Sequence, residues 1–160
     1  MNAIVREKNC TIPQRCTQMF FDGHYGVYRE EHFIEMLAFE RKRSERSGKP
    51  FVLMTLTILE ISELRSRRDT IRGAVEALSA FNRETDIKGW YRRESTLGVI
   101  FTETNNIDMS TLSEKVYQRL HAQLTEAQVD AIQLSFHEYP DDQGPAIPIS
   151  PEFLLLPLYD

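Results

Sequence analysis

A continuous apolar run near the middle of the chain constrains the fold more than any other feature. Residues Phe51–Leu59 read FVLMTLTIL, a run without a charge that is rich in β-branched and long aliphatic side chains. Such a run is typical of a strand that is buried on both faces. It is much shorter than the roughly 18 consecutive apolar residues of a membrane span. We therefore predict that it is the central strand of a sheet with helices packed on it.

The residues before this run predict an amphipathic helix from Arg29 to Ser47. Gly48 and Pro50 follow it and are typical of a helix end. A stripe at i, i+3, i+4 and i+7 spacing, three of whose four members are apolar, would face the core; it consists of Phe33, Met36, Leu37 and Glu40.

Two further helices are predicted after the central strand. Asp69 or Thr70 can cap the first of them, whose apolar residues recur every three or four positions as Ile71, Val75, Leu78 and Phe81. Thr111 and Glu114 have the spacing of a capping box for the second, which continues through Leu112, Val116, Leu120 and Leu124.

Three more strands are predicted around these helices. Ile87–Tyr91 and Thr96–Thr102 form a hairpin joined by the polar residues Arg92–Ser95. Ala131–Glu138 alternates apolar and polar residues, as a strand with one solvated face does. The resulting fold class is α/β, in its α+β form: a central, mostly antiparallel sheet flanked by helices.

The two ends of the chain differ from its middle. Residues 1–21 have no sustained period and are predicted to be an N-terminal arm, followed by a domain over residues 22–142. Residues 143–160 contain four of the seven prolines, which excludes a regular helix, yet they include the apolar run Phe153–Leu156. We expect this tail to lie against the domain or against another chain.

Composition places the chain among ordinary globular proteins. Its 160 residues are 41% hydrophobic and 27% charged, and the net charge is −5. Seven acidic residues and no Lys or Arg follow Arg119, so a globally basic nucleic-acid binder is not expected. Residues 1–8 do not begin a secretion signal, and together with the lack of a membrane span this predicts a cytoplasmic protein.

Cys10 and Cys16 are the only cysteines, and they have neither CxxC spacing nor a nearby histidine pair. Reduced, incidental thiols are the simpler interpretation. The four histidines fall in separate elements, so we expect no metal and no cofactor.

The order of several short patterns resembles the GGDEF family, the domain of bacterial diguanylate cyclases. Asp22, Gly26 and Phe33 in DGHYGVYREEHF have the spacing of the family's DxLTGLxNRxxF pattern, and the residues from Arg46 to Pro50 are similar to its RxGxP-like turn. Arg83 and Asp86 match its RxxD motif, five residues ahead of the signature hairpin. LGVIFTET and LSFHEYPDD resemble its later strands. The resemblance covers about residues 22 to 142 and implies the GGDEF-like, nucleotidyl-cyclase-like fold.

The resemblance also locates groups that the family's chemistry needs and that this chain lacks. The GGDEF signature corresponds to Arg92, Arg93, Glu94, Ser95 and Thr96, so long cations replace both glycines. The metal-binding DxD-like pattern corresponds to Thr57–Leu59, where no carboxylate stands to bind Mg²⁺. The guanine-binding segment corresponds to Glu60–Arg68 and lacks the family's turn. We therefore expect a degenerate, catalytically inactive domain.

In the family, the RxxD motif binds cyclic di-GMP, with the arginine as a forked donor and the aspartate as an acceptor. Arg83 and Asp86 are thus a possible cyclic di-GMP site. The structural alternative is that Arg83 ends a helix while Asp86 caps a turn. Two main hypotheses follow: a regulatory module that acts through a protein partner or self-association, or a receptor for cyclic di-GMP. An enzyme with a relocated site is a third alternative.

Overall fold

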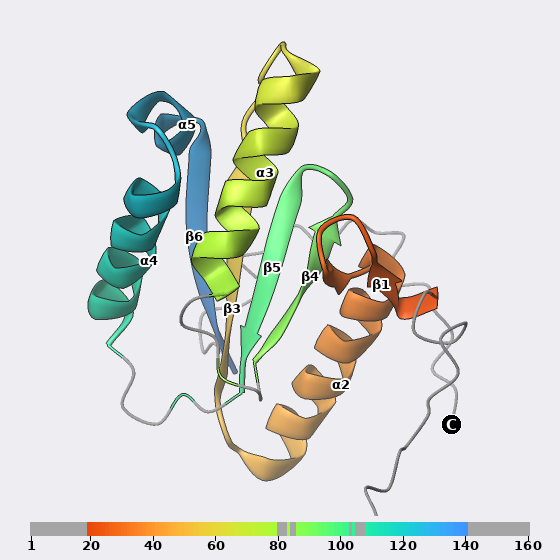
Figure 1. Ribbon diagram of the computed structural model, residues 1–160. Coiled ribbons are helices and arrows are strands. Elements are labelled where there is room, and N and C mark those ends of the chain that lie inside the picture. The colour runs from red at the N-terminus through yellow and green to blue at the C-terminus, as the bar shows by residue number, and fades with distance from the viewer. Residues whose placement is uncertain (1–18, 80–82, 84–85, 103, 105–107, 141–160) are drawn as a thin grey trace, which may run out of the picture.

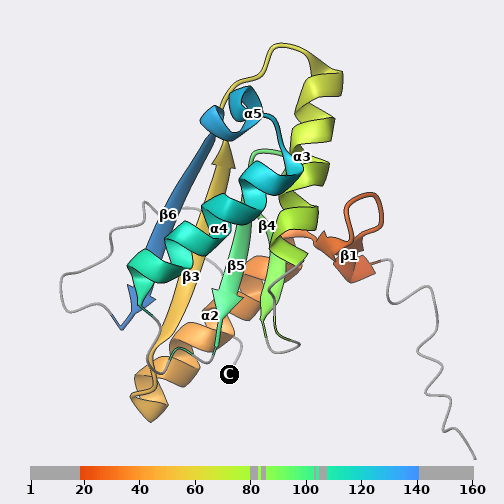
Figure 2. The same ribbon diagram turned by 60° about the vertical axis from the view of Figure 1, so that its left-hand side comes forward.

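The computed structural model describes residues 19–79, 83, 86–102, 104 and 108–140. It contains a six-stranded sheet with helices on both faces (Figures 1 and 2). The elements, in chain order, are β1 (Phe21–Asp22), β2 (Val27–Tyr28), α2 (Glu30–Ser47), β3 (Phe51–Ile58), α3 (Leu64–Ser79), β4 (Ile87–Arg92), β5 (Thr96–Phe101), α4 (Met109–Gln123), α5 (Glu126–Asp130) and β6 (Ile132–Tyr139).

The strand order is β1-β2-β4-β5-β3-β6, and only β2 and β4 pair in parallel. The predicted fold class, a mostly antiparallel sheet flanked by helices, is therefore confirmed. The predicted strand Phe51–Leu59 is β3, which lies inside the sheet between β5 and β6. All of its residues except Thr57 are buried, as a largely apolar run without a charge predicts.

The two faces of β3 contribute to two separate cores. Phe51 and Leu53 face α2 and pack in a small cluster with Phe33, Leu37 and Ile100. The intervening residues Val52, Met54 and Leu56 belong to the larger core on the opposite face, beneath α3 and α4. Because helices cover both faces of β3, its residues are apolar on both faces, and Thr55 and Thr57 are its only polar residues.

Helix α2 agrees with the predicted helix to within one residue. Gly48 ends it with a left-handed φ of 68°, and its N–H donates to the carbonyl of Ser44 at 2.9 Å. Phe33 and Leu37 are buried, whereas Met36 and Glu40 are only partly so. The ring of Phe33 lies on Gly89 and Gly98, which stand opposite each other in β4 and β5.

The predicted start of the second helix was wrong. Helix α3 begins at Leu64, so Asp69 and Thr70 lie inside it rather than at its cap. The Thr70 hydroxyl donates to the carbonyl of Ser66 at 2.7 Å, one turn back. The arginine-rich turn before Asp69 consists largely of good helix formers and extends the helix. Ile71 and Leu78 are buried as predicted, and Phe81 lies outside the described residues.

The predicted cap of the third helix was also wrong. Helix α4 is capped by Asp108, whose carboxylate accepts from the N–H of Ser110 at 3.2 Å. Thr111 instead donates its hydroxyl to the same carboxylate at 2.7 Å. Asp is at least as good a cap as Thr, and it comes three residues earlier. A capping box does occur, but at Thr125 and Gln128 of the short helix α5.

The hairpin and the last strand follow the prediction closely. Arg92 still belongs to β4, next to a register irregularity, so three residues rather than four connect the strands. In β6 the apolar alternation of Ile132, Leu134 and Phe136 faces the larger core.

The ends of the chain are only partly described. The arm predicted for residues 1–21 lies outside the described residues up to residue 18, and Phe21 pairs with Tyr28 in β1 and β2. The predicted tail at residues 143–160 lies wholly outside them. Among the described helices, none combines the length and apolarity needed to cross a bilayer.

Candidate functional site at the turn between β4 and β5

The end of β3 lies beside the turn that connects β4 and β5. Thr57 pairs with Thr96, and their hydroxyl oxygens are 3.2 Å apart and share a hydrogen bond. Leu59, two residues further on, is about half exposed. The structure therefore brings together the DxD-like and signature positions of the sequence. A neutral hydroxyl pair and a half-exposed leucine stand where the resemblance to the family would place carboxylates.

The turn itself is fixed by contacts with β3 and α3. The N–H of Ile58 donates to the carbonyl of Ser95 at 2.8 Å, and the guanidinium of Arg67 donates to the carbonyl of Glu94 at 2.5 Å. Glu94 has a φ of 59°, a left-handed conformation that is uncommon for a residue with a side chain. Two carbonyls of the turn are therefore engaged by neighbouring elements.

One amide of the turn is engaged by a carboxylate of the chain. The N–H of Arg93 donates to Oε2 of Glu30 at 2.7 Å. Glu30 stands in the first turn of α2, where a negative charge is favoured by the helix dipole. A side-chain carboxylate thus binds an N–H of the segment that, by resemblance, would approach phosphate.

The β1–β2 ribbon is tied to β4 by a second carboxylate. The indole N–H of the buried Trp90 donates to Oδ2 of Asp22 at 2.9 Å, and the N–H of His24 donates to Oδ1 at 3.0 Å. Gly26, with a φ of 69°, donates its N–H to the carbonyl of Asp22. Tyr25 packs edge-on against Trp90, and burial raises the pKa of its phenol, with the charge of Glu94 as the next cause.

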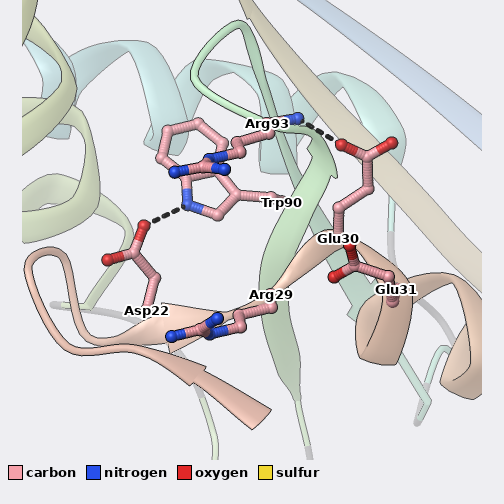
Figure 3. Close-up of a pocket in the computed structure, with 6 residues that line it drawn as sticks. All are labelled: Asp22, Arg29, Glu30, Glu31, Trp90 and Arg93. Atoms are coloured by element: carbon pink, nitrogen blue, oxygen red, sulfur yellow. Dashed lines mark hydrogen bonds between the residues drawn. The ribbon is translucent and has the colours of Figure 1, made fainter. Parts of the chain in front are cut away.

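A shallow pocket of about 140 Å³ lies between this ribbon, the start of α2 and the turn (Figure 3). In the view of Figure 3, the guanidinium groups of Arg29 and Arg93 lie on the left of the pocket, as Trp90 does. The carboxylates of Glu30 and Glu31 lie on the right. Asp22 completes the lining. No group of three or more His, Cys, Asp or Glu side chains in the described part of the chain is arranged to hold a metal ion.

Arg83 and Asp86 lie close together ahead of β4. The N–H of Arg83 donates to the carboxylate of Asp86, and the N–H of Asp86 donates to the carbonyl of Arg83, both at 3.0 Å. The signature turn follows the other end of β4, so the six residues of this strand, roughly 20 Å long at 3.3 Å each, separate the two predicted sites. The structure does not bring them together.

Sequence reasoning missed Glu30 and Arg67 as partners of the turn. An acidic residue at a helix start and an arginine inside a helix have ordinary local explanations. Nothing in the sequence indicates that α2 and α3 approach the turn from opposite faces of the sheet.

Comparison with protein-family models gives no match for this chain, and neither does comparison with curated protein sequences. Solved structures do match. A diguanylate cyclase protein from Thermotoga maritima is 15% identical, with a TM-score of 0.54 over 76% of this chain and 88% of that one. The GGDEF domain of DgcB from Caulobacter crescentus, in complex with c-di-GMP, is 15% identical, with a TM-score of 0.55 over 86% of this chain and 78% of that one.

The diguanylate cyclase SiaD from Pseudomonas aeruginosa, in complex with its activator SiaC, is 19% identical to this chain. Its TM-score is 0.58 over 80% of this chain and 56% of that one. At these identities the likeness concerns the fold and leaves the activity open. The chain has the fold of GGDEF domains.

Proposed function

We propose that the protein is a non-catalytic regulatory module on a GGDEF-like scaffold and that it acts through protein partners. One observation carries this proposal: Thr57, near the end of β3, and Thr96, at the start of β5, share a hydrogen bond between their hydroxyl groups. Leu59 stands at the other position of the DxD-like pattern and is half exposed.

The residues at this place do not fit Mg²⁺. Magnesium in nucleotide-dependent enzymes is held by carboxylates and phosphate oxygens, and neutral threonine hydroxyls do not replace them. The two hydroxyls are also engaged with each other at 3.2 Å. Glu94 is the one carboxylate of the turn itself, and a single carboxylate is a weak basis for binding two metal-loaded nucleotides.

Other parts of the expected nucleotide site make contacts within the chain, which supports the proposal. Glu30 binds the N–H of Arg93 in the signature turn. The second half of the segment Glu60–Arg68 forms the first turn of α3 rather than a base-binding loop. Three changes at three separate places support loss of catalysis better than any one of them would.

Direct measurement of cyclic di-GMP synthesis tests this proposal. The purified full chain is incubated with GTP and Mg²⁺, and an active diguanylate cyclase is assayed in parallel to validate the conditions. We expect product only from the active enzyme. Product from this chain that disappears in Glu94→Gln would overturn the proposal, because it would show a working carboxylate at the turn.

Action through protein partners is supported by the SiaD structure, in which a protein of this fold is bound to an activator protein. Affinity purification of the tagged chain from its native cells, followed by mass spectrometry, identifies such partners. Specific partners should be recovered at a level comparable to the bait. Recovery of nothing beyond an untagged control contradicts this part of the proposal.

Reception of cyclic di-GMP through Arg83 and Asp86 is the second candidate. Solved domains of this fold occur in complex with that nucleotide, and the four-residue pattern precedes β4. Calorimetry with cyclic di-GMP on the native chain, Arg83→Ala and Arg92→Ala separates the possibilities. Binding that is lost only in Arg83→Ala supports the receptor, and no heat from the native chain rejects it.

A further inference from the structure

One edge of the sheet is a complete strand with no neighbour among the described residues. Strand β6 pairs with β3 over all eight of its residues, without a bulge, and lies at the border of the sheet (Figure 2). The opposite edge is β1, which has only two residues. Very short edge strands avoid pairing with other chains, and an eight-residue edge strand does not have that protection.

The hydrogen bonds of β3 show which backbone groups of β6 point outward. The N–H of Leu59 donates to the carbonyl of Ala131, whereas the N–H of Ile58 donates to Ser95 beside β5. Because antiparallel pairing alternates, the odd-numbered residues of β6 bond to β3. The even-numbered residues therefore direct their N–H and C=O groups to the open edge; these are Ile132, Leu134, Phe136 and Glu138.

Most of the devices that blunt an exposed edge are missing from β6. The strand contains no Lys, no Arg and no Pro, and Glu138 is its only acidic residue. Leu134 and Phe136 are only partly buried, although they pack against the larger core. An additional strand along this edge would cover both side chains.

We propose that β6 pairs antiparallel with the β6 of a second copy, about a two-fold axis at Ser135, so that the two sheets become continuous. In this register Leu134 of each copy lies opposite Phe136 of the other, and Ile132 lies opposite Glu138. All four outward-facing residues then find outward-facing partners. If the axis passed through Leu134 or Phe136 instead, one of these four outward-facing residues would have no outward-facing partner among them.

The side chains agree with this choice of occupant. A two-fold interface must be self-complementary, and the two nearest positions on either side of Ser135 are alike: Leu134 and Phe136 are apolar, and Gln133 and His137 are polar. The next pair, Ile132 and Glu138, is not alike. Leu134 meets Phe136 on one face of the sheet, and Ser135 meets its own copy on the other. No like charges stand opposite each other, because Glu138 faces an isoleucine.

Cysteine cross-linking tests the register directly. Ser135→Cys is made in the full chain with Cys10→Ser and Cys16→Ser, and the oxidised protein is run on a non-reducing gel. Residues opposite each other in a non-hydrogen-bonded pair have Cα atoms about 4.5 Å apart, which permits a disulfide. We expect a covalent dimer. Gln133→Cys is the matched control, because Gln133 shares the face but lies opposite His137 of the other copy.

Sedimentation measures the association itself. The native chain should form a dimer, and Ser135→Lys should weaken it by roughly tenfold or more because two like charges then face each other. Gln133→Lys should leave the dimer intact, and circular dichroism verifies that both variants are folded. A native chain that stays monomeric overturns the proposal, including when residues 143–160 cover the edge. Equal cross-linking of the two cysteine variants also overturns it.

Discussion

Glu30 Oε2 accepts a 2.7 Å hydrogen bond from the backbone N–H of Arg93, which joins the start of α2 to the turn between β4 and β5. The two residues are 63 positions apart in the chain, and neither has a local reason to meet the other. This contact uses an amide of the turn that, in a phosphate-binding loop, would face the ligand.

Replacing Glu30 by alanine removes the acceptor of the Arg93 N–H. The contact is solvent-exposed, so water can replace part of it, and we expect a loss of roughly 1 kcal/mol in the free energy of unfolding. Urea denaturation of the native chain and Glu30→Ala measures this change. Glu31→Ala is the matched control, since Glu31 lines the same pocket without a hydrogen bond in the described structure, and its stability should change little.

Gly98 cannot carry a side chain without displacing Phe33. A Cβ atom at Gly98 would lie 2.5 Å from Cζ of Phe33, which is itself fully buried. Overpacking of this kind costs roughly 1–3 kcal/mol, so Gly98→Ala should lower the melting temperature. Gly23→Ala has no heavy atom within 4 Å of the new Cβ and should be neutral. A neutral Gly98→Ala would mean that Phe33 moves easily.

Asp22 holds the indole of Trp90 by a hydrogen bond of 2.9 Å. Because Trp90 is 1% exposed, Asp22→Ala leaves a buried N–H without its acceptor and should cost roughly 1–3 kcal/mol. Trp90 is the only tryptophan in the chain, so its fluorescence spectrum reports this site alone. We expect an altered emission maximum in Asp22→Ala and a smaller change in Asp22→Asn, whose amide oxygen still accepts. Identical spectra in all three proteins would contradict the observed bond.

Asp108 makes the stability of α4 depend on pH. Hydrogen bonds from the Thr111 hydroxyl and the Ser110 N–H lower the pKa of its carboxyl below 3.8. A lowered carboxyl pKa contributes stability above the unfolded-state pKa, and that stability is lost as the pH falls through the folded-state value. The difference in unfolding free energy between the native chain and Asp108→Ala should therefore be constant near neutral pH. It should shrink in acid below about pH 4; a difference that grows there would refute this assignment.

Much of the fold follows from local patterns. The apolar run of β3, the period of α2 and the polar break between β4 and β5 each predict their element to within one or two residues. Helix starts were less predictable, because several residues near Asp69 and Thr111 can each serve as a cap. Which of these residues becomes the cap depends on how much tertiary packing stabilises the neighbouring helical turns.

At the candidate site too, some features follow from residue type and others from tertiary packing. Residue type alone establishes which side chains are absent, because Thr57 and Leu59 carry no carboxylate in any fold. The packing of distant segments places the Thr57 hydroxyl within hydrogen-bonding distance of Thr96, Glu30 against the turn, and Arg83 and Asp86 at the far end of β4. The two contributions differ because residue type sets the chemistry available to a side chain, whereas tertiary packing sets which groups come within hydrogen-bonding distance.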